Sequence, residues 1–158
     1  MKLSTKFGFM AVALIALGCG GGSSVGGLDA EATYTISLTQ SKEVPTPKAT
    51  TASGSAQIIV YANSIDYQVS ASSIAAVTMA HIHNGAVGVA GPIVVTLFNS
   101  VNNPVTPNGV FASGTLDASN LPAGVTIASL KALIASGKAY VNVHTLTNPS
   151  GEIRGQIQ

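Results

Sequence analysis

Three histidines are the residues of this chain best suited to metal chemistry. His81 and His83 are separated by one residue within the stretch Ala-His-Ile-His-Asn-Gly at 80–85, and His144 follows much later, between Val143 and Thr145. The chain contains no other histidine, because its composition holds three in total. Neutral imidazole binds copper, zinc and nickel. If the two segments pair in a sheet, every imidazole of the protein could meet at one point.

A β-strand would present the first two histidines on one side. The two-residue period places His81 and His83 on the same face as Val77 and Met79, with the two histidine Cα atoms about 6.5–7 Å apart. Imidazoles at that spacing can converge on one ion with bonds of about 2.0–2.1 Å, and His144 is the remaining candidate for a third ligand. The Met79 thioether would favour copper, particularly Cu(I). The open alternative is an unmetallated cluster in which Met79 only fills the core.

The other chemically capable groups are few. Arg154 shares a face with Glu152 in the last expected strand, where it either attracts a small anion beside the histidines or has a structural role, bridging carbonyl groups or pairing with Glu152. No catalytic residue is predicted. The chain has no Gly-x-Ser-x-Gly turn and no phosphate-binding loop, and its six acidic residues are scattered rather than paired.

Alternating polar and apolar residues predict the elements that would hold these groups. Turns that contain Gly and Pro separate the expected strands. Each strand has one apolar face, which is typical of an antiparallel β-sandwich of about seven or eight strands. One short helix is expected near 126–136, from the cap Thr126 to the terminating Gly137. The strands are predicted at 32–38, 53–62, 65–70, 77–83, 93–98, 110–116, 139–145 and 152–158.

The first residues predict export from the cell. Lys2 and Lys6 precede an apolar run at 7–17 that is short for a bilayer span, so residues 1–18 are expected to be a signal peptide. The run ends in Ala-Leu-Gly-Cys at 16–19, which resembles a bacterial lipobox except that Ala16 replaces the usual Leu. Cys19, the only cysteine, is therefore expected to carry a lipid, and a flexible Gly/Ser linker covers 19–31.

The net charge of the chain and the expected lipid anchor limit the partners that the protein can bind. Removing the two signal-peptide lysines from seven basic residues leaves five against six acidic ones, so no basic surface for nucleic acid is expected. The partners expected are the membrane, through the lipid, and an extracellular protein or glycan. Gly20 after the cysteine, in place of Asp, favours the outer membrane or cell surface over the inner membrane.

Two blocks of the sequence resemble a known family. The first is 80–85 with Gly88 and Gly-Pro-Ile-Val at 91–94, and the second runs from Gly-Lys-Ala-Tyr-Val-Asn-Val-His-Thr at 137–145 through Asn-Pro-Ser-Gly-Glu-Ile-Arg-Gly-Gln-Ile at 148–157. Both resemble the CHRD domain, named after chordin and found in many bacterial exported proteins, and the resemblance covers about residues 32–158. It implies an immunoglobulin-like or Greek-key antiparallel β fold and very little about activity. The role of animal chordins as antagonists of signalling factors does not carry over.

A weaker resemblance concerns the pattern of chemistry. His-x-His on a strand, a Gly-rich loop, and a C-terminal turn followed by Arg154 are similar to the copper side of Cu/Zn superoxide dismutases. The chain departs from that family because it lacks the zinc-loop histidines and the internal disulfide, and because it has three histidines where a dismutase copper site uses four.

These observations predict a lipid-anchored module of the cell envelope with a non-enzymatic binding or structural role. The alternative is a protein that binds copper, or zinc, through His81, His83 and His144, for storage, delivery or redox protection. A dismutase-like copper oxidoreductase has the least support. The two metal hypotheses require that His144 point toward His81 and His83.

Overall fold

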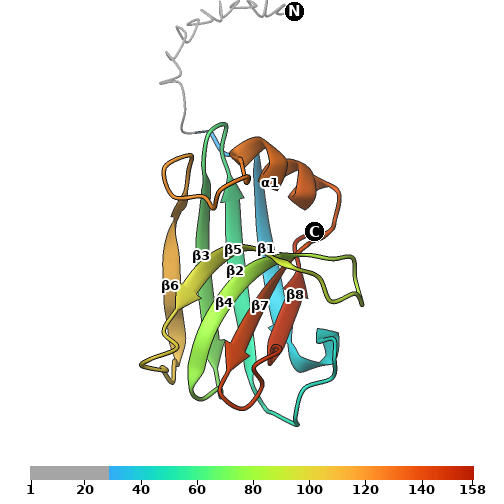
Figure 1. Ribbon diagram of the computed structural model, residues 1–158, viewed down its shortest axis with the longest axis vertical. Helices are drawn as coiled ribbons and strands as arrows, with labels where there is room; N and C mark the ends of the chain where they lie inside the picture. Colours follow the sequence, from blue (N-terminus) through green and yellow to red (C-terminus); the bar gives the residue numbers. More distant parts are fainter. Residues whose placement is uncertain (1–28) are drawn as a thin grey trace, which may run out of the picture.

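The computed structural model describes residues 29–158. The expected signal peptide, Cys19 and most of the expected linker lie outside the described residues. Figure 1 shows strands β4, β7 and β8 crossing in front of β1, β2 and β3, with the single helix α1 over one end. Among residues 29–158, no helix has the length and apolar character needed to cross a membrane.

Eight strands, one α-helix and one short 3-10 turn make up the fold. In chain order they are β1 (Ala32–Thr39), the 3-10 turn η1 (Gln40–Lys42), β2 (Ser53–Val60), β3 (Ile65–Ser72), β4 (Val77–Asn84), β5 (Ile93–Asn99), β6 (Gly109–Leu116), α1 (Ile127–Ala135), β7 (Ala139–Thr145) and β8 (Ile153–Gln156). The predicted strands and the predicted helix are all present, with boundaries that differ by a few residues.

The strands form one antiparallel sheet that folds over on itself. Their order is β5-β4-β7-β8-β1-β2-β3-β6, and β8 joins β1 through the single pair Thr39–Arg154. The sheet bends at that narrow junction, so that four strands face the other four, and the outer strands β5 and β6 come into contact. The all-β, antiparallel, sandwich-like fold with one short helix is the one that the strand patterns predicted, and the structure adds that the single sheet is nearly closed.

The core fills the space between the two halves. Alternate residues of β2 and β7, such as Ile58, Val141 and Val143, are fully buried there. The helix closes one end of the core with Leu130 and Ile134. Its first turn is capped as predicted, because the Thr126 hydroxyl accepts a hydrogen bond from the backbone N–H of Ser129 at 3.0 Å.

The half-sheet of β5, β4, β7 and β8 is unusual because one of its two inner strands, β7, is buried on both faces. All seven residues of β7 are buried. Apolar side chains of these strands face the core, and their other face, here called the outer face, carries polar and aromatic side chains under a cover of loops. The buried polar and aromatic residues of the outer face are His81, His83, Tyr140, Asn142, His144, Glu152 and Arg154.

One residue predicted for the histidine face lies elsewhere. The pairing of β4 with β7 shifts between Val77 and Met79, since Val77 lies opposite Thr145 while Met79 lies opposite His144. This irregularity adds a residue to β4 and reverses the alternation before it. Val77 is consequently fully buried in the hydrophobic core, and the prediction that it shares the histidine face was wrong.

Candidate metal centre

Pairing of β4 with β7 brings the three histidines together on the outer face. His81 lies opposite Asn142, His83 opposite Tyr140, and His144 opposite Met79. The two strands are antiparallel, so His83 and His144 lie on either side of the His81–Asn142 pair and their rings lean over it. The third partner that the spacing of the sequence required is therefore supplied by the neighbouring strand.

The imidazoles are close enough to share one ion. One ring nitrogen from each of His81, His83 and His144 lies within 4.8 Å of the others, and Nε2 of His83 is 3.4 Å from Nε2 of His144. All three side chains are buried, with 2%, 6% and 5% of their surface exposed. Metal–nitrogen bonds of about 2.0–2.1 Å fit this separation. The predicted convergence of the histidines is confirmed.

Backbone carbonyl groups set the tautomers of two of the rings. Nδ1 of His83 lies 2.9 Å from the Gly91 carbonyl oxygen, and Nδ1 of His144 lies 3.0 Å from that of Pro149. A carbonyl oxygen can only accept, so each Nδ1 carries the proton and donates it. Each Nε2 is then left with a lone pair, and the two lone pairs point toward the same space. Metal-binding histidines are held in this way by the hydrogen bond of their other nitrogen.

Burial keeps these rings neutral. It lowers the pKa of His81 to about 4, with further lowering from the charges that His144 and His83 would carry. Burial also lowers the pKa of His144 to about 4, against the hydrogen bond to Pro149, which raises it. The pKa of His83 is lowered by the same cause. At neutral pH the rings are thus uncharged, which is the state that binds metal.

Arg154 supports the centre from the next strand. Its guanidinium carbon lies 3.3 Å from the centroid of the Tyr140 ring, and the same ring stacks on His83 with centroids 4.9 Å apart. The guanidinium donates to the carbonyl oxygens of Val89 and Ala86, each at 3.0 Å. These are the carbonyl-bridging contacts of the structural alternative.

Three expectations concern the side chains around the histidines. Glu152 does not pair with Arg154 but accepts hydrogen bonds from the hydroxyls of Thr50 and Thr145, both at 2.6 Å. The attraction of an anion to Arg154 stays a prediction. Met79 is half-buried and opposite His144, and its role as a fourth ligand also stays a prediction.

Two residues of the site were not predicted as functional. Asn142 lies between His81 and Arg154 in the strand register, and its Nδ2 donates to Oε2 of Glu43 at 3.4 Å. Glu43 is buried, and burial raises its pKa to about 7, with the charge of Arg154 as the main opposing influence. Asn142 could have been found from its place two residues before His144, on the same face of the strand. Glu43 comes from a loop that offers no comparable signal.

Comparison with known proteins gives one match. A family model described as the CHRD domain matches residues 34–157, a range that includes all three histidines and both residues that sequence reasoning missed. No curated protein matches the chain. No solved structure matches it.

Proposed function

The chain belongs to the CHRD domain family, and from that premise we propose that it is an exported copper-binding protein whose ligands are His81, His83 and His144. The observation that carries the proposal is the convergence of three buried, neutral imidazoles within 4.8 Å of one another. A plain structural cluster would pair its ring nitrogens. Here the Nε2 atoms of His83 and His144 lie 3.4 Å apart with no proton between them, because both rings carry their proton on Nδ1. Nδ1 of His81 has no hydrogen-bond partner among the described residues.

Copper is the metal that this ligand set favours. The three ligands are neutral nitrogens, and copper heads the affinity order for divalent metals at such sites. Arg154 is near enough for its charge to lower the pKa of His83, so a metal of lower charge, such as Cu(I), would be repelled less than Zn(II). Storage, delivery or redox protection would each use such a centre.

Two other functions have less support than copper binding. The first is a non-enzymatic module of the cell envelope that binds a protein or a glycan without metal, which family membership allows. A dismutase-like oxidoreductase has the least support, since the chain contains three histidines in all. In addition, Arg154 is held by two loop carbonyls, which leaves it less free to meet a substrate anion.

Attachment to the membrane through a lipid on Cys19 is part of the proposal. The lipobox-like stretch at 16–19 and the Gly/Ser-rich residues after it support it. We expect the protein expressed in a bacterium to incorporate a clickable fatty acid and to enter the detergent phase of a Triton X-114 extract. The variant Cys19→Ser should do neither, while Ser23→Ala should behave as the unaltered protein. Equal labelling of Cys19→Ser and the unaltered protein would contradict the anchor.

Calorimetric titration tests the copper proposal directly. We expect the full-length protein, purified in detergent, to bind one Cu(II) per chain with a dissociation constant of micromolar or below. His83→Ala should weaken binding by at least about a hundredfold, since it removes one of three metal–nitrogen bonds. No heat at micromolar copper would refute the proposal.

A second variant guards against adventitious binding. Asp66 lies on β3, in the other half of the sheet, where its carboxylate accepts a hydrogen bond from Thr115 at 2.6 Å. Asp66→Asn removes a possible surface ligand for copper and should leave the titration unchanged. If Asp66→Asn lost affinity and His83→Ala did not, the heat would come from surface carboxylates.

A further inference from the structure

Unpaired polar atoms lie in a row beside the histidines. Within residues 29–158, the buried side-chain atoms without a hydrogen-bond partner are His81 Nδ1, Asn142 Oδ1 and Glu43 Oε1. His81 and Asn142 are opposite each other in the strand register, and Asn142 is joined to Glu43 by the 3.4 Å hydrogen bond. Folded proteins pair nearly all buried polar atoms. Three unpaired atoms on three adjoining residues therefore point to a common ligand.

A metal at the three histidines accounts for one of these atoms. Bound through His81 Nδ1, it would leave Asn142 Oδ1 and Glu43 Oε1, which are both acceptors when Glu43 is ionised. The orientation of the Asn142 amide follows from its neighbour, since an ionised carboxylate only accepts and so faces the Nδ2 donor. The amide oxygen is then the atom left without a partner.

Close packing of the backbone holds this pair in place. A Cβ added to Gly151 would lie 2.5 Å from Asn142 Nδ2 and 2.7 Å from Glu43 Oε2, and the residue has a φ of +131°. Both the contact and the backbone angle require glycine at this position. The amide and the carboxylate are consequently positioned by the turn that precedes β8, as well as by each other.

We propose that the metal carries a water molecule as its fourth ligand, and that this water donates its two O–H groups to Asn142 Oδ1 and Glu43 Oε1. A metal-bound water uses its lone pair on the metal and keeps two donors, and the site offers two unpaired acceptors. Three protein ligands with water in the fourth position is the common arrangement of a centre that exchanges ligands. This inference rests on the proposed function and makes the centre open rather than closed by Met79.

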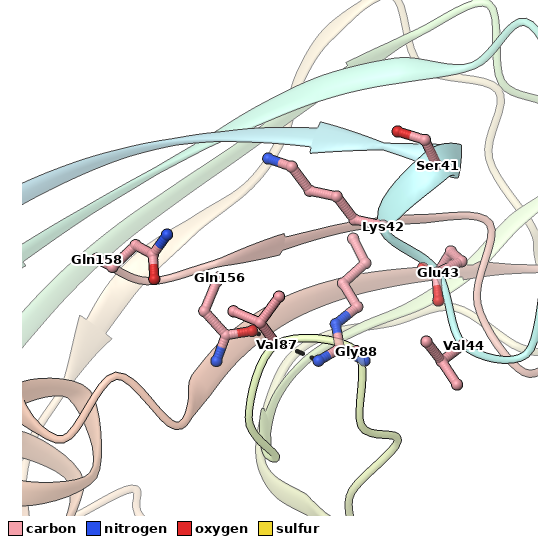
Figure 2. A pocket seen from close by; sticks show the side chains of 9 residues that line it. Ser41, Lys42, Glu43, Val44, Val87, Gly88, Gln156 and Gln158 are labelled. Carbon is pink, nitrogen blue, oxygen red and sulfur yellow. Dashed lines mark hydrogen bonds between the residues drawn. The ribbon is translucent and has the colours of Figure 1, made fainter.

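Glu43 also lines a pocket at the surface of the protein. A pocket of about 270 Å³ lies between η1 and the loop after β4, and its lining includes Lys42, Glu43, Val44, Val87 and Arg154. In Figure 2 the Glu43 and Val44 side chains lie at one side of this pocket, across from Gln156 and Gln158. Glu43 is thus the residue that lines the pocket and also contacts Asn142 beside the histidines.

Azide binding to the Cu(II)-loaded, full-length protein tests the open position. We expect electron–nuclear double resonance to detect the strongly coupled protons of a copper-bound water, which disappear in D2O and are distinct from the weakly coupled N–H protons of His83 and His144. Azide should add a charge-transfer absorption band. Asn142→Ala and Glu43→Gln should retain copper with about tenfold weaker affinity. Both should bind azide about tenfold more tightly, because the water to be displaced has lost a hydrogen bond to the protein.

Further variants make the outcome decisive. Asp66→Asn, on β3, is the control and should change neither the proton signal nor the azide affinity. Met79→Leu tests the open centre against one closed by the thioether, because it should leave copper affinity unchanged only if the sulfur is not a ligand. If Asn142→Ala does not fold, the similarly shaped Asn142→Asp replaces it and should weaken azide binding, because a carboxylate repels the anion. Copper binding without the strongly coupled water protons or an azide band would overturn this inference alone, as would unchanged azide affinity in both Asn142 and Glu43 variants. An unaltered protein that bound no copper at all would overturn the proposed function as well.

Discussion

Copper at one hundred times its dissociation constant is expected to raise the free energy of unfolding by about 2.7 kcal/mol, because it binds the folded state only. For a domain of this size the melting temperature should rise by about 10 °C. The histidines lie on two strands whose Cα partners include Met79–His144 and His83–Tyr140, so one ion would join β4 to β7. The measurement is thermal unfolding followed by circular dichroism at several copper concentrations, with a chelator for the metal-free reference.

His144→Ala is expected to abolish that copper-dependent rise. The variant loses one ligand and leaves the Pro149 carbonyl without its 3.0 Å donor. Leu146→Ala is the matched control, since Leu146 lies two residues further along the chain, directly after β7, with 64% of its surface exposed. It should melt with the same copper-dependent shift as the unaltered protein. A full shift in His144→Ala would show that the copper binds elsewhere.

Acid is expected to destabilise the metal-free protein between about pH 6.5 and pH 4. Burial lowers the pKa of His81 and His144 from 6.5 to about 4, so in this window the unfolded chain binds more protons than the folded one. Stability then rises with pH across the window and is lost as the pH falls through it. Above pH 6.5 these two histidines are neutral in both states and contribute no pH dependence.

Glu43 has the opposite effect on the free energy of unfolding as the pH falls. Burial raises its pKa from 4.5 to about 7, so the folded state holds an extra proton over that range and gains stability as the pH falls. His81 and His144 against one carboxyl leave a net loss on the order of 3 kcal/mol on acidification to pH 4. The pKa of His83 is also lowered by burial, so His83 adds to this loss. Urea denaturation in chelator at pH 7, 6, 5 and 4 measures it.

Glu43→Gln separates the two contributions to this pH dependence. The variant lacks the opposing group, so its loss of stability in acid should be steeper than that of the unaltered protein. Thr50→Val is a suitable control, because Thr50 lies in the same loop and its hydroxyl bonds Glu152 rather than a histidine. Stability that stays constant from pH 7 to pH 4, or a shallower loss in Glu43→Gln, would show that the buried histidines do not set the acid sensitivity.

Local sequence patterns predicted most of the fold because the relevant forces are local. The alternation of Tyr34, Ile36 and Leu38 reports which side of a strand faces the core. The Thr126 cap and Gly137, with its φ of 68°, mark the ends of the helix from side-chain and backbone preferences alone. Val77 shows the limit, because the extra residue in β4 depends on how β7 and β4 align and leaves no trace in the alternation.

The sequence by itself determined the all-β class, the shared face of His81 and His83, and His144 as the one available third ligand, since periodicity and composition are properties of the chain alone. Only the tertiary structure decided that these three histidines meet, that backbone carbonyls hold two of them as neutral ligands, and that Glu43 joins Asn142 beside them. Those contacts join loops and strands far apart in the chain, as the hydrogen bond between Asn142 and Glu43 does. Their geometry depends on how the sheet folds over, which no local pattern encodes.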